Sequence, residues 1–199
     1  MQTLNRGIDS GSVQGRQDEL AQSSLSGVRW DIAHTAEATN QLDVVFRQVL
    51  NRGIDSGSVQ GRQDELGASS LSAVRSDLAY TAEASTALTN MFQSVLSRTP
   101  DNLSGNQASL AGGASLAILR HSLAYSVEAS DKITAAYWNE LGRNPDNLAG
   151  NQAGLDGGSS LATLRHSLAY SAEASTKITG NRGKTPGGHG FRQSGSGIG

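Results

Sequence analysis

The stretch SLAILRHSLAYSVEAS at residues 115–130 returns as SLATLRHSLAYSAEAS at residues 160–175, an offset of 45 residues. A second identity lies upstream, because NRGIDSGSVQGRQDEL occupies residues 5–20 and, letter for letter, residues 51–66, an offset of 46. Self-similarity at a fixed period of this length is typical of stacked repeats, in which each unit buries its apolar face against its neighbours. The chain is therefore predicted to be a tandem repeat.

Aligned on these identities, the chain divides into an incomplete first repeat, which begins in a turn, then complete repeats and a Gly-rich tail. The predicted boundaries are 1–40 for the incomplete repeat, 41–86, 87–131 and 132–176 for the complete repeats, and 177–199 for the tail. Residues 180–199 contain 8 Gly in 20 positions and no acidic residue. This part of the tail is predicted to be a flexible linker or a segment that a partner orders.

Each copy contains three stretches with helical signals. The clearest begins at Thr81, a good N-cap, and Glu83 in its first turn complements the helix dipole. Its apolar residues then recur at helical spacing and predict one buried stripe, made of Leu88, Met91, Phe92, Val95 and Leu96. Phe46 and Leu50 are the corresponding core residues one copy earlier. The predicted fold class is all-α: tandem repeats of about 45 residues with three short helices each.

The turn after this helix and the short helix that follows also recur. An Asp in each turn is predicted to cap the short helix: Asp55, Asp101 and Asp146. A Gly recurs within the short helix: Gly61, Gly105 and Gly150. Since Gly inside a helix costs about 1 kcal/mol relative to Ala, its recurrence indicates either a close approach of two helices or a late helix start.

Composition excludes several classes of protein and site. The chain has no Cys, which excludes disulfides, thiolate zinc sites and cysteine nucleophiles. A net charge of −2 provides no global field for nucleic acid or an anionic membrane, and no stretch is long and apolar enough for membrane insertion. The chain shows no signal peptide, and no opposed pair of carboxylates or other catalytic group is found. We therefore expect no enzyme activity, no cofactor and no metal.

A recurring Arg–Asp pair in the turns has two readings. It is either a ligand-binding pair or a structural joint in which Arg ties the end of one helix to the cap of the next. Repetition in successive copies favours the structural role for Arg52 and Asp55, Arg98 and Asp101, and Arg143 and Asp146. A second Arg column, formed by Arg75, Arg120 and Arg165, is predicted to reach the Glu that opens the following helix.

A few aromatic and His residues are the candidates for ligand binding. His121 lies four residues before Tyr125, and His166 four residues before Tyr170, so each pair shares a helical face. These pairs could bind a glycan or a metal, although no paired His motif supports the metal, and Tyr137 and Trp138 are further candidates for glycan binding. The alternative is a solvated helix face, which we favour because the other copies place Ser76 and Trp30 in the His column.

The two best-preserved copies resemble a known family. LSRTPDNLSGNQASLAGGASLAILRHSLAYSVEAS at 96–130 and LGRNPDNLAGNQAGLDGGSSLATLRHSLAYSAEAS at 141–175 carry the pattern. They resemble a bacterial tandem domain of unknown function found in large secreted proteins and distantly similar to phycobilisome linker domains. The resemblance implies an all-helical interaction module without established catalytic residues. It is weaker in the first copies, where NRGID replaces the R-x-P-D turn.

These observations favour a non-catalytic structural module that mediates protein–protein contacts in a larger assembly, extracellular or in a virus particle. The alternative is a glycan-binding adhesion module, and nucleic acid is a disfavoured partner. A protein partner or a second copy is expected to bind through the incomplete N-terminal repeat and the Gly-rich tail. The motivating observation is that a set of apolar residues has no preceding helix to cover it: Val13, Leu20, Leu25 and Val28.

Overall fold

The computed structural model describes residues 10–182, and within this range every regular element is an α-helix. The helices are α1 (Ser10–Gln22), α2 (Leu25–Ala33), α3 (Ala36–Leu50), α4 (Ser56–Ala68), α5 (Leu71–Ala79), α6 (Ala82–Leu96), α7 (Leu103–Ala111), α8 (Leu116–Ala124), α9 (Val127–Leu141), α10 (Leu148–Asp156), α11 (Leu161–Ala169) and α12 (Ala172–Arg182). The predicted all-α class is confirmed. Most of the predicted Gly-rich tail, from residue 183 onward, lies outside the described residues.

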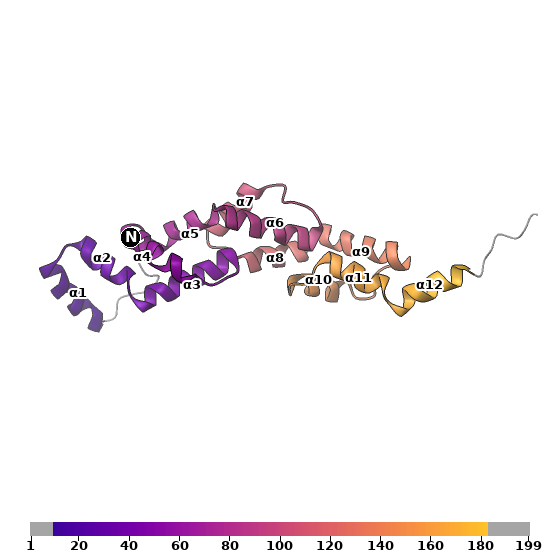
Figure 1. The fold of residues 1–199 in the computed structure, drawn as a ribbon, viewed down its shortest axis with the longest axis horizontal. Helices are drawn as coiled ribbons and strands as arrows, with labels where there is room; N and C mark the ends of the chain where they lie inside the picture. The colour runs from indigo at the N-terminus through magenta and orange to yellow at the C-terminus, as the bar shows by residue number, and fades with distance from the viewer. Residues whose placement is uncertain (1–9, 183–199) are drawn as a thin grey trace, which may run out of the picture.

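Helices of equal length recur in the same order along the chain. The helices α3, α6 and α9 each have 15 residues, and α2, α5, α8 and α11 each have 9. Helix α2 packs against α4, α5 against α7, and α8 against α10. Figure 1 shows an elongated body with α1 and α2 at one end and α12 at the other. The helical packing is therefore repeat-like.

The caps of the long helices are those expected from the sequence. The hydroxyl of Thr81 accepts a hydrogen bond from the backbone N–H of Ala84 at 3.2 Å, which satisfies one of the free donors of the first turn. Thr35 and Ser126 cap α3 and α9 in the same way. Each long helix ends at a residue with left-handed backbone: Asn51, Ser97 and Gly142. This geometry stops the helix and starts the turn.

The short helices correct two expectations. Asp55 caps α4, but the caps of α7 and α10 are Asn102 and Asn147, one residue after the predicted Asp101 and Asp146. A Cβ at Gly105 would lie 2.4 Å from the capping amide of Asn102. The recurring Gly therefore marks a late helix start in α7. In α4, which begins earlier, a Cβ at Gly61 would meet nothing within 4 Å, so no close helix approach explains it.

The predicted apolar stripes form the core. Phe46, Leu50, Phe92 and Leu96 are all buried, which confirms the prediction. The largest buried cluster contains residues from α3 to α11, so one core runs through most of the stack. At the N-terminal end, Val13, Leu20 and Leu25 are exposed as expected. The expectation is wrong for Val28, which is buried in α2, the helix that packs against α4.

Candidate functional site

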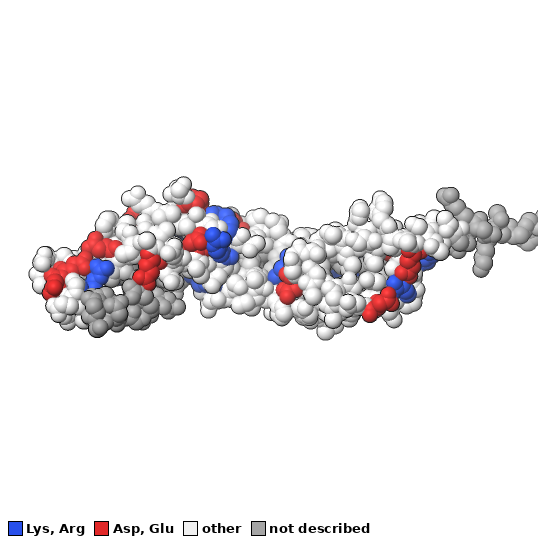
Figure 2. Space-filling model, turned by 90° about the horizontal axis from the view of Figure 1, so that it is seen from below, with Lys and Arg blue, Asp and Glu red and all other residues white. Residues whose placement is uncertain are grey.

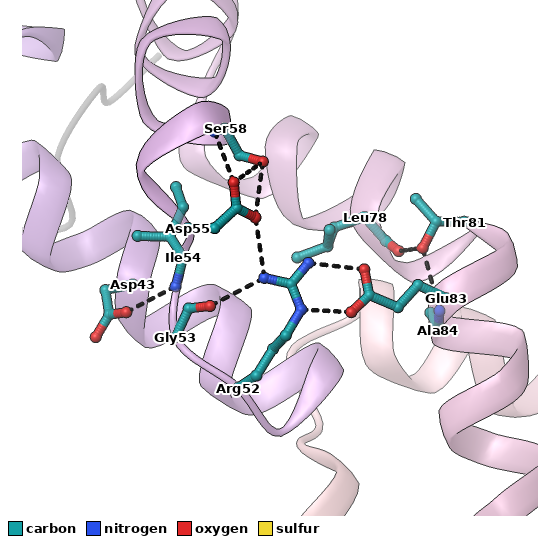
Figure 3. Close-up of polar contacts among 10 residues, drawn as sticks. All are labelled: Asp43, Arg52, Gly53, Ile54, Asp55, Ser58, Leu78, Thr81, Glu83 and Ala84. Carbon is teal, nitrogen blue, oxygen red and sulfur yellow. Dashed lines mark hydrogen bonds and ion pairs between the residues drawn. The ribbon is translucent and has the colours of Figure 1, made fainter.

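The turn after α3 contains a joint between three helices. Arg52 donates through Nε and Nη2 to the two carboxylate oxygens of Glu83, in the first turn of α6, with the Nη2 contact at 2.8 Å. Its Nη1 donates to the carbonyl of Gly53 and lies 3.2 Å from Oδ2 of Asp55, the cap of α4. Figure 3 shows the guanidinium between these carboxylates. One side chain thus connects the end of α3 to the starts of α4 and α6.

The same arrangement, which we call the arginine–glutamate joint, recurs along the stack. The equivalents are Arg98 with Glu128 at 2.6 Å and Asp101 at 2.8 Å, and Arg143 with Glu173 at 2.6 Å and Asp146 at 2.7 Å. These contacts support a structural role for the Arg–Asp pairs, but only Asp55 is itself the cap of the next helix, since Asn102 and Asn147 cap α7 and α10. The bidentate partner is a Glu about 30 residues away, and a planar guanidinium matches a carboxylate in this geometry.

Each joint also covers an aromatic ring and shifts a pKa. The guanidinium carbon lies over the ring of the preceding helix: Arg52 over Phe46 at 5.3 Å, Arg98 over Phe92 at 5.5 Å and Arg143 over Tyr137 at 5.5 Å. In each joint, the hydrogen bond from the arginine lowers the pKa of the partner Glu carboxyl below its ordinary value; these carboxyls are Glu83, Glu128 and Glu173. The joints therefore stabilise the ionised carboxylates.

A different joint is formed by the second Arg column. Arg75, in α5, is 8% exposed, and its Nε donates to the carbonyl of Leu110 at 2.6 Å. Its Nη2 donates to the carbonyl of Ala114 and its Nη1 to Oε1 of Gln48. Burial lowers the pKa of Arg75. This arginine–carbonyl joint binds two carbonyls at and after the C-terminal end of α7, of which that of Leu110 also accepts from the N–H of Gly113 at 3.2 Å.

The arginine–carbonyl joint recurs on both sides of Arg75. Arg29 donates to the carbonyl of Ser69, and Arg120 donates to the carbonyls of Leu155 and Ser159, both at 2.6 Å. The prediction that Arg75 and Arg120 reach the Glu that opens the following helix is wrong, because the turn arginines hold that Glu. Arg165, the last member of the column, is exposed, and no hydrogen bond or ion pair within the described residues involves it.

A buried Gln column escaped the sequence interpretation. The side-chain amides of Gln63, Gln107 and Gln152 donate to hydroxyls on the neighbouring long helix, those of Thr39, Ser85 and Ser130, at 2.9 to 3.0 Å. All three Gln side chains are buried. Their recurrence at one position of the short helix was the available signal, since a polar residue repeated inside a core needs a repeated partner.

The predicted His and Tyr pairs form ring contacts on the surface. The rings of His121 and Tyr125 lie 4.7 Å apart and those of His166 and Tyr170 lie 4.5 Å apart, so each pair does share a helix face. His121 also lies 2.8 Å from Oδ2 of Asp156 in α10, which makes it a link between neighbouring helices. Tyr170 is 79% exposed. The pair on α11 is the more accessible of the two.

Tyr137 and Trp138 lie in different environments. Tyr137 is half-buried against the core, under Arg143, and its hydroxyl accepts from the amide of Asn151. Trp138 is exposed and donates from Nε1 to Asn144 at 2.9 Å. The two residues therefore do not form one aromatic surface, and Tyr137 is a core residue in the column of Phe46 and Phe92.

The charged surface and the comparisons assign no ligand class. On the face shown in Figure 2, most Lys and Arg side chains lie beside Asp or Glu, so no large patch of positive charge forms there. Within residues 10–182 no cluster of three or more acidic or His side chains could hold a metal ion. None of the described helices combines the length and apolar character needed to span a bilayer. No family model, curated protein or solved structure significantly matches the chain.

The arginine–glutamate joints predict a pH-dependent stability. The folded pKa of Glu128 is lowered by Arg98, so the folded protein binds fewer protons than the unfolded chain near the ordinary value of 4.5. The stabilisation is present above that value and is lost as pH falls through the lowered pKa. Glu128→Gln should therefore lower the melting temperature at pH 7 and flatten its decline toward pH 3, as followed by circular dichroism.

The matched control is Glu140→Gln, on the same helix but outside the joints. It should leave both the melting temperature at pH 7 and its pH dependence close to those of the unsubstituted chain. Equal effects of the two substitutions would contradict a specific role of the joint.

Proposed function

We propose that this chain is a non-catalytic structural module that mediates protein–protein contacts in a larger extracellular or virion assembly. The observation that carries the proposal is that the recurring arginines join helices to one another along an elongated stack. Arg52 and Arg75 each connect segments about 30 to 39 residues apart. Arginines that hold neighbouring helices together produce an elongated spacer, and its ends and faces can contact other proteins.

The surface supports the same proposal. Several large apolar side chains are exposed along the stack: Trp30, Ile118, Val127, Trp138 and Ile178 among them. Exposed aromatic and aliphatic side chains are the groups that protein interfaces most often bury. The resemblance of the R-x-P-D and G-G-x-S-L pattern to a domain of large secreted proteins supports an extracellular setting. A virus particle is the other assembly in which such a module would serve.

The test is native fractionation of the source material with amine-reactive cross-linking. Lys132 and Lys177 are exposed and lie on α9 and α12. We expect the chain to run in a particle much larger than itself, with cross-links from these lysines to other polypeptides at a fixed stoichiometry. A chain that always fractionates alone, with cross-links only within itself, would contradict the proposal.

The alternative function is glycan binding by an adhesion module. The observation that favours it is the exposed ring pair of His166 and Tyr170, because aromatic faces stack on sugar rings. A glycan array separates the two functions: binding that Tyr170→Ala abolishes supports adhesion. Tyr80→Ala is the matched control, since Tyr80 is also exposed, at 54%, but has Ser76 in place of the His.

A further inference from the structure

One helix–helix interface is built three times within the chain, and it has two distinct halves. The donor face is carried by α2, α5 and α8, each of which presents an Arg and an Ala one turn apart: Arg29 and Ala33, Arg75 and Ala79, Arg120 and Ala124. The acceptor end is carried by α4, α7 and α10, each with a Leu and a carbonyl past the C-terminal turn: Leu66 and Ser69, Leu110 and Ala114, Leu155 and Ser159.

Burial shows how tightly the two halves fit. Ala33, Ala79 and Ala124 on the donor faces are each 0% exposed. The leucines of the acceptor ends are buried as well, and each lies in the same core cluster as the alanine of its donor face: Leu66 with Ala33, Leu110 with Ala79 and Leu155 with Ala124. The interface therefore combines a small apolar contact with charge-assisted hydrogen bonds to helix-end carbonyls.

The described part of the chain also presents one unmatched copy of each half. On α11, Arg165 and Ala169 occupy the donor positions, and both are exposed. On α1, Leu20 occupies the position of the buried leucines but is 43% exposed, and Ser23 stands where Ser69, Ala114 and Ser159 accept from arginine. The residues that complete the interface three times inside the chain are thus present and exposed at its two ends.

The unmatched halves lie far apart along the stack. Figure 1 shows α1 at one end of the elongated body and α11 toward the other. When two molecules line up end to end, the donor face of one contacts the acceptor end of the other. This contact has the same form as the interface already present three times inside each chain. Such a contact joins two different surfaces, so each added copy presents a further donor face or acceptor end, and association continues into an open chain or until a ring closes.

We propose that copies of this chain associate head to tail, with the donor face of α11 in one copy receiving the acceptor end of α1 in the next. This rests on the proposed assembly function and names a second copy of the chain as the partner. Arg165 donates to the backbone carbonyl of Ser23 in the next copy, and Leu20 of that copy packs against Ala169. The contact requires no group beyond those that the internal interfaces already use.

Sedimentation of the full 199-residue chain over a wide range of concentrations tests the proposal. The mass is expected to rise with concentration for the unsubstituted chain and to stay that of a monomer for Ala169→Trp, which blocks the donor face. Ala162→Trp is the matched control, because this position of α11 is exposed and so are its counterparts Ala117 and Ser72. It should associate like the unsubstituted chain.

A mixing experiment distinguishes head-to-tail contact from other modes. Leu20→Arg blocks the acceptor end and should also give a monomer with unchanged helix content. When the Leu20→Arg and Ala169→Trp chains are mixed, each still has one intact end, so they should form a one-to-one complex that grows no further. A mixture that remains monomeric, or an unsubstituted chain that is monomeric at every concentration, would overturn the proposal and leave the end faces to another protein or to residues outside 10–182.

The two proposals fail in different experiments. A chain that is monomeric by sedimentation but cross-links at fixed stoichiometry to other polypeptides in the native source would refute self-association alone. A chain that polymerises when purified but is found in the native source only as a free chain, with no cross-links to other polypeptides, would refute the assembly function.

Discussion

Phe92→Ala is expected to lower the free energy of unfolding by about 3–5 kcal/mol, the usual cost of removing a buried Phe side chain. Phe92 lies in the largest core cluster, where α6 contacts both preceding and following helices. Its ring also supports the guanidinium of Arg98 at 5.5 Å. The substitution therefore leaves a cavity and removes the surface on which one arginine–glutamate joint rests. Chemical denaturation followed by circular dichroism measures the change.

The matched control is Trp138→Ala on α9, a larger aromatic side chain that is half exposed. It should change the free energy of unfolding by about 1 kcal/mol or less, the central value for single substitutions outside a special structural role. If Phe92→Ala were as mild as Trp138→Ala, the stripe from Leu88 to Leu96 would not be the core of this helix.

Arg75→Ala is expected to lower the free energy of unfolding by about 1–3 kcal/mol, the cost of leaving buried polar groups without a hydrogen-bond partner. The substitution removes a donor from the carbonyls of Leu110 and Ala114 and from the amide oxygen of Gln48, although the Leu110 carbonyl keeps its hydrogen bond from the N–H of Gly113 at 3.2 Å. Arg75→Lys should recover only part of the loss, because an ammonium group does not reproduce the planar fork of donors. The measurement is again chemical denaturation.

Arg165→Ala provides the comparison within the same column. Arg165 is exposed and within residues 10–182 has no hydrogen-bond partner, so its removal from a dilute monomer should cost no more than about 0.5 kcal/mol. Equal losses at Arg75 and Arg165 would show that the arginines act through their own helices and not through the joint to the next one.

The local structure of this chain could be predicted from its sequence. The caps at Thr35, Thr81 and Ser126, the recurring helical stripes and the burial of Phe46 and Phe92 could all be predicted from capping residues and from apolar residues spaced three or four positions apart. The shift of the cap from Asp146 to Asn147 lies beyond that resolution, since Asp and Asn are both good caps and stand side by side. The resemblance to a tandem domain of secreted proteins stays a prediction.

The period, the helical class and the columns of recurring residues can all be found in the amino-acid sequence. Which columns meet depends on how the helices pack: Arg52 contacts Glu83, 31 residues away, and Arg75 contacts the carbonyl of Ala114, 39 residues away. The physical reason is that a repeat fixes each column but not the direction in which a long arginine side chain reaches. That direction depends on how the short helices pack, and the same packing leaves Arg165 and Leu20 as exposed halves of an interface that is buried elsewhere.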